Sequence, residues 1–188
     1  MHGTNARVKH LLADALESIR TGLAPIIETR LAVAFGPTWR RRVLAEYLRR
    51  RPLYDASLGD LTGDAGVLLT VVLQEWDTLG RHLHGCRHWI DMMRVMRNVW
   101  AHASGLDMPV AASAYTAAYE LAVRAGLRNV GDIRRRRNAI LREISAVPSV
   151  VATSPQEAHV RPERQDAHSP NGSVPLLREI ASRVDNRP

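Results

Sequence analysis

Three side chains near the middle of the sequence have types and spacing suited to proton transfer at a phosphodiester. Arg97, Asn98 and His102 lie close together on one predicted helix. An imidazole can take or give a proton near neutral pH, and a guanidinium can offset negative charge that develops on a phosphate. Asn98 and His102 are four residues apart, so on a helix they are close enough to share a hydrogen bond or a ligand. From spacing alone, the alternative is an ordinary solvated helix face.

One chain supplies only one histidine of this kind, whereas acid–base cleavage generally uses two titrating groups. A two-fold dimer would place a second copy of the three residues opposite the first. We therefore expect a homodimer with two copies of Arg97, Asn98 and His102 at its interface.

The helix that must position these residues is predicted to run from Arg87 to Ala103. At about 100° per residue, one stripe of large apolar side chains is expected to face the core; it comprises Trp89, Met92, Met93, Met96 and Trp100. The opposite stripe comprises Arg87, Asp91, Arg94, Asn98 and His102. Arg97 lies on the flank between the two stripes and can reach toward either.

The rest of the chain has helical periodicity almost throughout, with no convincing alternation of period two. The first helix includes Leu11 to Ile19 and has a kink or a restart at Pro25, followed by a stretch over Ile26–Ala34 that stops at Phe35-Gly36-Pro37. A loop is expected over residues 51–63. Further helices are predicted over Trp39–Arg50, Ala65–Leu83 with Asp64 as the cap, Pro109–Ala125 and Val130–Ala146. The fold class is therefore all-α.

The composition changes at Pro148, after which Pro, Ser, His and charged residues dominate and apolar clusters are scarce. This pattern predicts a helical domain over residues 1–147 and a flexible, disordered tail over residues 148–188. A short amphipathic helix over residues 174–184 is expected within the tail, where it could dock on the domain or on a partner.

The 188 residues carry a formal net charge of +7, and Lys9 is the only lysine. Arginine holds its charge and can bind a phosphate through two donors, so RNA is a candidate partner. We predict RNA contacts from four arginines, Arg94, Arg134, Arg135 and Arg137. The alternatives are a solubilising surface, or arginine enrichment caused by a GC-rich coding genome.

The single cysteine, Cys86, excludes an internal disulfide framework and a zinc site built on several cysteines. It favours a reducing, cytoplasmic location. The first 30 residues are too charged for a secretory leader, and the longest apolar run, Val67–Leu73, is too short to span a membrane. His82, His84 and His88 surround Cys86 but cross a predicted helix end, so we interpret them as chance neighbours. We expect no metal and no cofactor.

The segment Arg97-Asn98-Val99-Trp100-Ala101-His102 resembles the R-N-x-x-x-H signature of HEPN domains. Its fuller pattern, R-N-x-W-A-H, resembles that of the Swt-type branch, which is named for an endoribonuclease of messenger RNA quality control. Further similarity lies in Gly22–Arg30, Ala34–Trp39, Leu68–Trp76 and Arg94–Asn98, so roughly residues 7–145 are covered. The resemblance implies an up-down helical bundle with additional helices, usually dimeric.

The resemblance also implies an activity: metal-independent cleavage of RNA in which the ribose 2′-OH attacks the phosphate. Arg97 and His102 would be the catalytic pair, Asn98 the supporting polar residue, and the products a 2′,3′-cyclic phosphate and a 5′-OH. Bacterial relatives act as toxins held by an antitoxin, or in phage defence. The alternative is a non-catalytic HEPN interaction or dimerisation module in a larger defence or RNA-processing complex. A DNA-binding regulator is less favoured, because no helix-turn-helix pattern is visible.

Overall fold

The computed structural model describes residues 2–51 and 56–146 of the chain, with side chains from residue 5 onward. These residues belong to the first of two units, Met1–Ala146 and Val147–Pro188. The predicted tail over residues 148–188 and its short helix over residues 174–184 lie outside the described residues.

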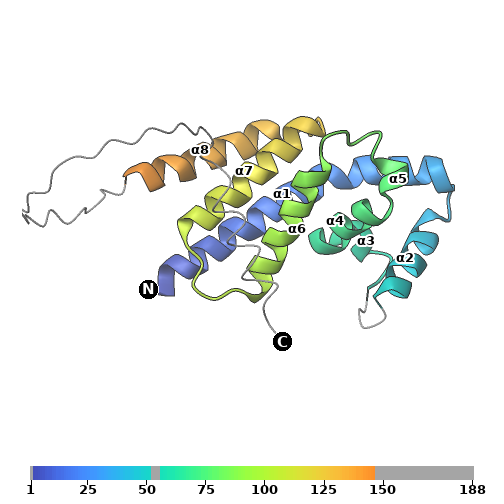
Figure 1. Cartoon of the computed structure of the whole chain (residues 1–188), viewed down its shortest axis with the longest axis horizontal. Helices are drawn as coiled ribbons and strands as arrows, with labels where there is room; N and C mark the ends of the chain where they lie inside the picture. Colours follow the sequence, from blue (N-terminus) through green and yellow to red (C-terminus); the bar gives the residue numbers. More distant parts are fainter. Residues whose placement is uncertain (1, 52–55, 147–188) are drawn as a thin grey trace, which may run out of the picture. The chain divides into compact units, whose positions relative to one another are not determined.

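Helices account for most of the described residues, and no strand occurs among them, so the all-α prediction is confirmed (Figure 1). In chain order they are α1 (His2–Phe35), α2 (Trp39–Arg50), α3 (Asp60–Gly63), α4 (Ala65–Gln74), α5 (Trp76–Leu79), α6 (Arg87–His102), α7 (Met108–Arg124) and α8 (Val130–Ala146).

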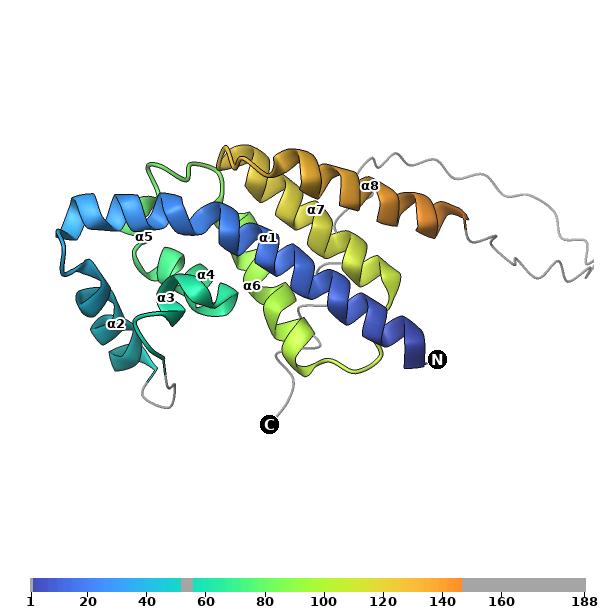
Figure 2. The same ribbon diagram turned by 180° about the vertical axis from the view of Figure 1, so that it is seen from behind.

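Helix α1 is one continuous helix that contains Pro25, so the chain does not restart there. Proline has no backbone N–H and therefore leaves the carbonyl of Thr21 without its usual helical donor. Figures 1 and 2 both show α1 changing direction about halfway along its length, as a kink at this proline predicts. The stop is confirmed as well, because Gly36 adopts φ of 73° and its N–H donates to the Ala32 carbonyl at 2.9 Å.

The core is built around α1 and α7, which pack against each other along much of their length. Helix α7 presents small side chains that allow its neighbours to approach closely; the fully buried ones are Ala111, Ala114, Ala118 and Ala122. Helix α6 packs on α1, α4 and α7, whereas α8 packs mainly on α7. Figures 1 and 2 show α6 and α8 on opposite sides of the α1–α7 pair.

Helix α2 has the predicted bounds and buries Val43 and Tyr47. Two predictions about the following segment were wrong. The expected loop contains the short helix α3, which begins where Asp60 accepts hydrogen bonds from the N–H and hydroxyl of Ser57 and which buries Leu61 completely. The predicted helix over residues 65–83 ends at Gln74, and α5 follows as a single turn.

Asp64 begins α4 as predicted, since its carboxylate accepts a hydrogen bond from the Val67 N–H at 2.8 Å. Helix α4 is buried on most of its circumference; its buried residues are Val67, Leu68, Leu69, Thr70, Val71 and Val72. This central helix therefore fixes the position of α6, which packs against it.

Candidate functional site

Helix α6 carries the three predicted site residues and is held by a stripe of buried side chains, Ile90, Met93, Met96 and Val99. The predicted core stripe is confirmed at Met93 and Met96, whereas Trp89 and Met92 are half-buried. It was wrong at Trp100, which is 38% exposed because the last turn of α6 reaches the surface. The helix ends at His102, one residue before the predicted end.

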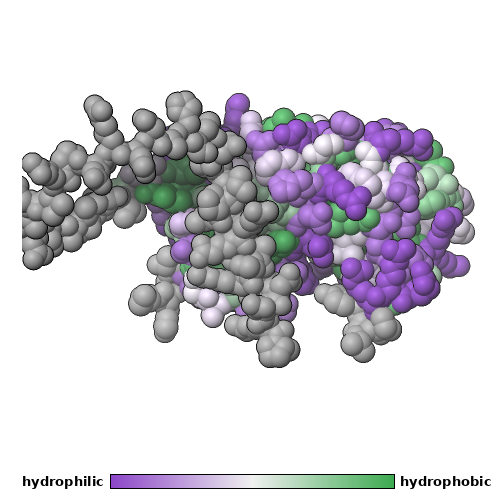
Figure 3. Space-filling model, viewed as in Figure 1, coloured by the Kyte–Doolittle hydropathy of each residue, from purple (hydrophilic) through white to green (hydrophobic). Residues whose placement is uncertain are grey.

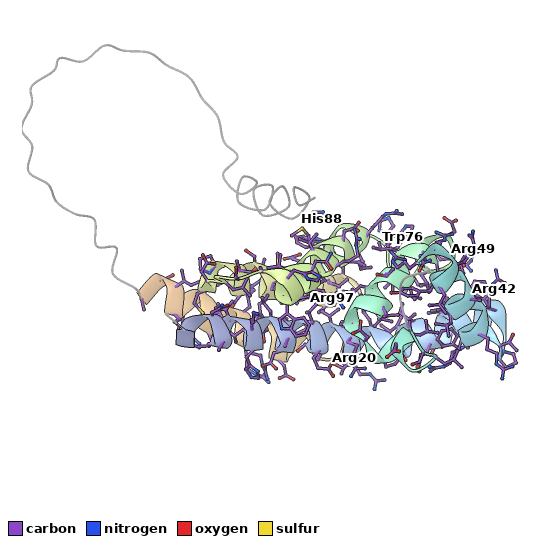
Figure 4. The ribbon with its side chains drawn as sticks, turned by 90° about the horizontal axis from the view of Figure 1, so that it is seen from below. Arg20, Arg42, Arg49, Trp76, His88 and Arg97 are labelled. Carbon is purple, nitrogen blue, oxygen red and sulfur yellow. The ribbon has the colours of Figure 1, made fainter. Side chains whose placement is uncertain are left out.

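Arg97 is half-buried and lies against the first turn of α4, where Figure 4 shows it at the contact between α6 and α4. A Cβ atom added to Gly66 would stand 2.6 Å from Arg97 Nε and 3.1 Å from Arg97 Cδ. Asp64 Oδ1 is also 3.1 Å from that point. Gly66 thus leaves the space that the Arg97 side chain occupies, close to the carboxylate that caps α4.

Asn98 is half-buried and His102 is exposed at the end of α6. Within residues 2–51 and 56–146, none of the side chains of Arg97, Asn98 and His102 makes a hydrogen bond or an ion pair, so the hydrogen bond envisaged between Asn98 and His102 is not formed. None of the three polar groups is therefore engaged by the described protein. Together they supply a guanidinium, an amide and an imidazole on adjacent turns.

A family model described as Swt1-like HEPN matches residues 14–124, more than half of the chain. The chain belongs to the Swt1-like HEPN family. The predicted family resemblance is confirmed by this match. No curated protein and no solved structure gives a significant match to the chain.

The matched segment of the HEPN domain runs from α1 into α7, and so includes Gly66 and the whole of α6. Helix α8 lies outside it. The family match therefore bears on the Arg97, Asn98 and His102 site but not on the arginines of α8.

Arg94 lies one turn before Asn98 on the HEPN motif helix and is half-buried. Its terminal nitrogen contacts Asp91 Oδ1 at only 3.5 Å, and its Nε atom is buried without a hydrogen-bond partner. Much of the hydrogen-bonding capacity of this guanidinium therefore remains available for a ligand on the side of α6 that carries Asn98.

The arginines of α8 lie on the other side of the HEPN core from α6 (Figures 1 and 2). Arg135 forms an ion pair with Asp132, and Arg137 stacks over the Tyr119 ring at 4.2 Å. Arg134 is exposed and forms no ion pair with the residues described. The structure therefore does not bring Arg134, Arg135 and Arg137 together with the motif within one chain, and their binding of RNA stays a prediction.

Cys86 is fully buried, and burial raises the pKa of its thiol. Over the described ranges, no group of three or more His, Cys, Asp and Glu side chains is arranged to hold a metal ion. Among the same residues, no helix of this HEPN domain is long and apolar enough to cross a membrane.

Sequence reasoning missed Gly66, which lies against Arg97, and Gln74, a polar residue farther along α4. Gly66 is a glycine inside an otherwise apolar helical stretch, and such a residue often marks a close approach by another group. Gln74 is the only uncharged polar residue besides Thr70 in α4, and both of its side-chain amide atoms are buried without a partner. The sequence signals that could have identified them are an isolated glycine and a polar residue within an apolar helix.

Proposed function

We propose that this HEPN domain is a metal-independent endoribonuclease that cleaves RNA through the ribose 2′-OH. The observation that carries the proposal is the set of three adjacent polar side chains on α6, Arg97, Asn98 and His102, none of which is engaged by a protein partner among the described residues. Arg97 is held in place by its packing over Gly66, and His102 is open to solvent. The family match supports it, since it covers all three residues.

In the proposed reaction, neutral His102 takes the proton of a ribose 2′-OH, and the 2′-oxygen attacks the adjacent phosphorus. The bond between phosphorus and the 5′-oxygen then breaks, and this oxygen receives a proton from a cationic imidazole. The products are a 2′,3′-cyclic phosphate and a 5′-OH. Arg97 stabilises the extra negative charge of the phosphorane, and Asn98 orients the phosphate or the imidazole.

The reaction needs one imidazole as base and one as acid, and each chain contributes one to the motif. We therefore include a homodimer in the proposal, in which His102 of a second copy supplies the proton for the leaving oxygen. The exposed position of His102 at the end of α6 allows such an approach.

The test is a cleavage assay on a panel of single-stranded RNAs in the presence of excess EDTA, with analysis of the product ends. We expect cleavage by the wild-type chain and none by His102→Ala, with the same helicity and oligomeric state for both. His84→Ala is the matched control, because His84 is also exposed but lies in the turn before α6. A single 2′-deoxy substitution before the cleaved bond should abolish the reaction. Cleavage that persists in His102→Ala or requires a divalent metal contradicts the proposal.

The second candidate function is a non-catalytic interaction module. It is favoured by Trp100, because an exposed tryptophan is typical of the centre of protein interfaces. Absence of cleavage by the wild-type chain, together with loss of self-association or partner binding in Trp100→Ala, would support this function instead.

A further inference from the structure

A second polar site lies beside the motif, in a pocket of about 240 Å³ between α2, α4 and α6. Its lining residues are Arg50, Arg51, Thr70, Leu73, Gln74 and Arg94. Figure 3 shows hydrophilic side chains gathered over the α2 end of the face it displays. The pocket is smaller than the cavities of about 300–1,000 Å³ that hold drug-sized ligands, so its size suits a nucleobase or a phosphate rather than a large cofactor.

Two of the residues that line the pocket carry buried polar atoms that the protein itself does not satisfy. Both amide atoms of Gln74 and the Nε atom of Arg94 are buried and lack a hydrogen-bond partner. Buried polar groups in folded proteins are nearly always paired, so three unpaired atoms at one pocket point to a ligand that pairs them. The amide offers a donor and an acceptor side by side, and Arg94 adds a further donor.

The charges at the pocket favour an anion. It is lined by three guanidinium groups. The described carboxylates near them are Glu46, which pairs with Arg49 and lies 2.6 Å from Arg50, Glu75, whose charge interacts with that of Arg50, and Asp91, at 3.5 Å from Arg94. Arg51 stacks over the Tyr47 ring at 5.2 Å and makes no ion pair with a described carboxylate. Among the described residues, Arg51 is therefore the lining guanidinium without a carboxylate partner, and the contact of Arg94 with Asp91 is weak.

The pocket and the motif lie along the same contact between α4 and α6. Gly66, Thr70 and Gln74 are spaced four residues apart and share one face of α4. Gly66 contacts Arg97, whereas Thr70 and Gln74 line the pocket together with Arg94. A strand bound at Arg97 can therefore continue along this face of α4 into the pocket.

We propose that this pocket binds one nucleotide of the RNA strand whose cleaved phosphate lies at Arg97 and His102, an inference that rests on the proposed function. The Gln74 amide pairs with an edge of the base that presents one donor and one acceptor, and the arginines bind the phosphate. Gln74 is thereby the residue that gives the enzyme its sequence preference.

The first test uses the His102→Ala chain, so that RNA is bound without being cleaved. Fluorescence anisotropy measures its affinity for short homopolymers of A, C, G and U, with and without Gln74→Leu. We expect Gln74→Leu to weaken binding of the preferred homopolymer by about 5- to 150-fold, the range for loss of one bidentate base contact, and to leave the others nearly unchanged. The substitution removes unsatisfied polar atoms, so the variant should fold at least as stably as its parent.

The second test separates pocket charge from surface charge. Arg49 and Arg50 both pair with Glu46 from the end of α2, but only Arg50 lines the pocket. Arg50→Gln should weaken binding of all four homopolymers and lower the slope of log affinity against log salt by about one. Arg49→Gln should leave the affinity for all four unchanged.

Each outcome decides the proposal. Equal base preference with and without Gln74→Leu overturns it, and so does an equal effect of Arg49→Gln and Arg50→Gln. Binding of 5′-mononucleotides that depends on Gln74, without binding of the homopolymers, overturns the assignment to an RNA strand. If the wild-type chain cleaves no RNA but the Gln74 and Arg50 effects on binding are found, the ribonuclease proposal fails while the nucleotide site stands.

Discussion

Replacement of Gly66 by alanine should displace the Arg97 side chain, and so lower the cleavage rate, without lowering the stability of the fold. The added Cβ would stand 2.6 Å from Arg97 Nε, whereas unstrained contacts between such atoms are about 3.5 Å. The guanidinium must therefore move by about 1 Å. A misplacement of about 1 Å at a reacting group can cost about 100-fold in rate, so we expect cleavage to fall by about that factor.

The same substitution should not destabilise the fold. Alanine stabilises a helix over glycine by about 0.5–1 kcal/mol, and Arg97 has no hydrogen bond or ion pair with the described residues to lose. We expect the free energy of unfolding, measured by urea denaturation, to be unchanged or up to about 1 kcal/mol higher.

Gly63→Ala is the matched control, because a Cβ at Gly63 meets no atom within 4 Å. It should leave the cleavage rate at the wild-type level. The assay measures the single-turnover rate at which Gly66→Ala, Gly63→Ala and Arg97→Ala cleave one RNA. Full activity in Gly66→Ala beside an inactive Arg97→Ala would refute the reasoning, since it would show that the space over Gly66 does not set the position of the guanidinium.

Two further predictions concern the stability of the domain. Burial raises the pKa of Glu75 above its ordinary value of 4.5, although the charges of Arg42 and Arg50 act in the opposite direction. Because the folded state then binds the proton more tightly than the unfolded state, the free energy of unfolding should fall as the pH rises from about 4.5 through the raised pKa. Thermal melts should show Glu75→Gln more stable than wild type at pH 7, and an advantage that is as large at pH 4 would contradict this assignment. Asp107 caps α7 by accepting a hydrogen bond from the Val110 N–H at 3.2 Å, so Asp107→Ala should lower the free energy of unfolding by about 1 kcal/mol; an unchanged urea midpoint would show that the cap contributes nothing.

The helices that the sequence predicts well are those whose ends carry strong local signals. Helix α2 lies between Gly36-Pro37 and Arg51-Pro52, and α7 begins directly after its cap Asp107 with a proline in its first turn. These helix ends are determined by backbone chemistry within a few residues. The break of α4 at Gln74 has no such signal, because the apolar spacing continues through Trp76 to Leu79. It accompanies tertiary packing, in which α5 contacts α1 as well as α4.

The site was predictable in its residue types but not in its surroundings. The spacing of Asn98 and His102 identifies the polar face of α6, and the buried Met93 and Met96 confirm the opposite one. Periodicity does not show how far a helix extends beyond its neighbours, which is why Trp100 was wrongly predicted to face the core. It also cannot show that Gly66, about 30 residues before Arg97 in the sequence, provides the space for that side chain.

The burial of Cys86 has a practical consequence for measuring how two copies of the chain approach each other. It is the sole cysteine of the full sequence, and its side chain is inaccessible. A thiol-directed spin label would therefore attach only to a cysteine introduced at the surface, for instance at Ser104, which is exposed two residues after the end of α6. Distances between two such labels would test the proposed homodimer, because they report how far apart the C-terminal ends of α6 lie in two associated copies.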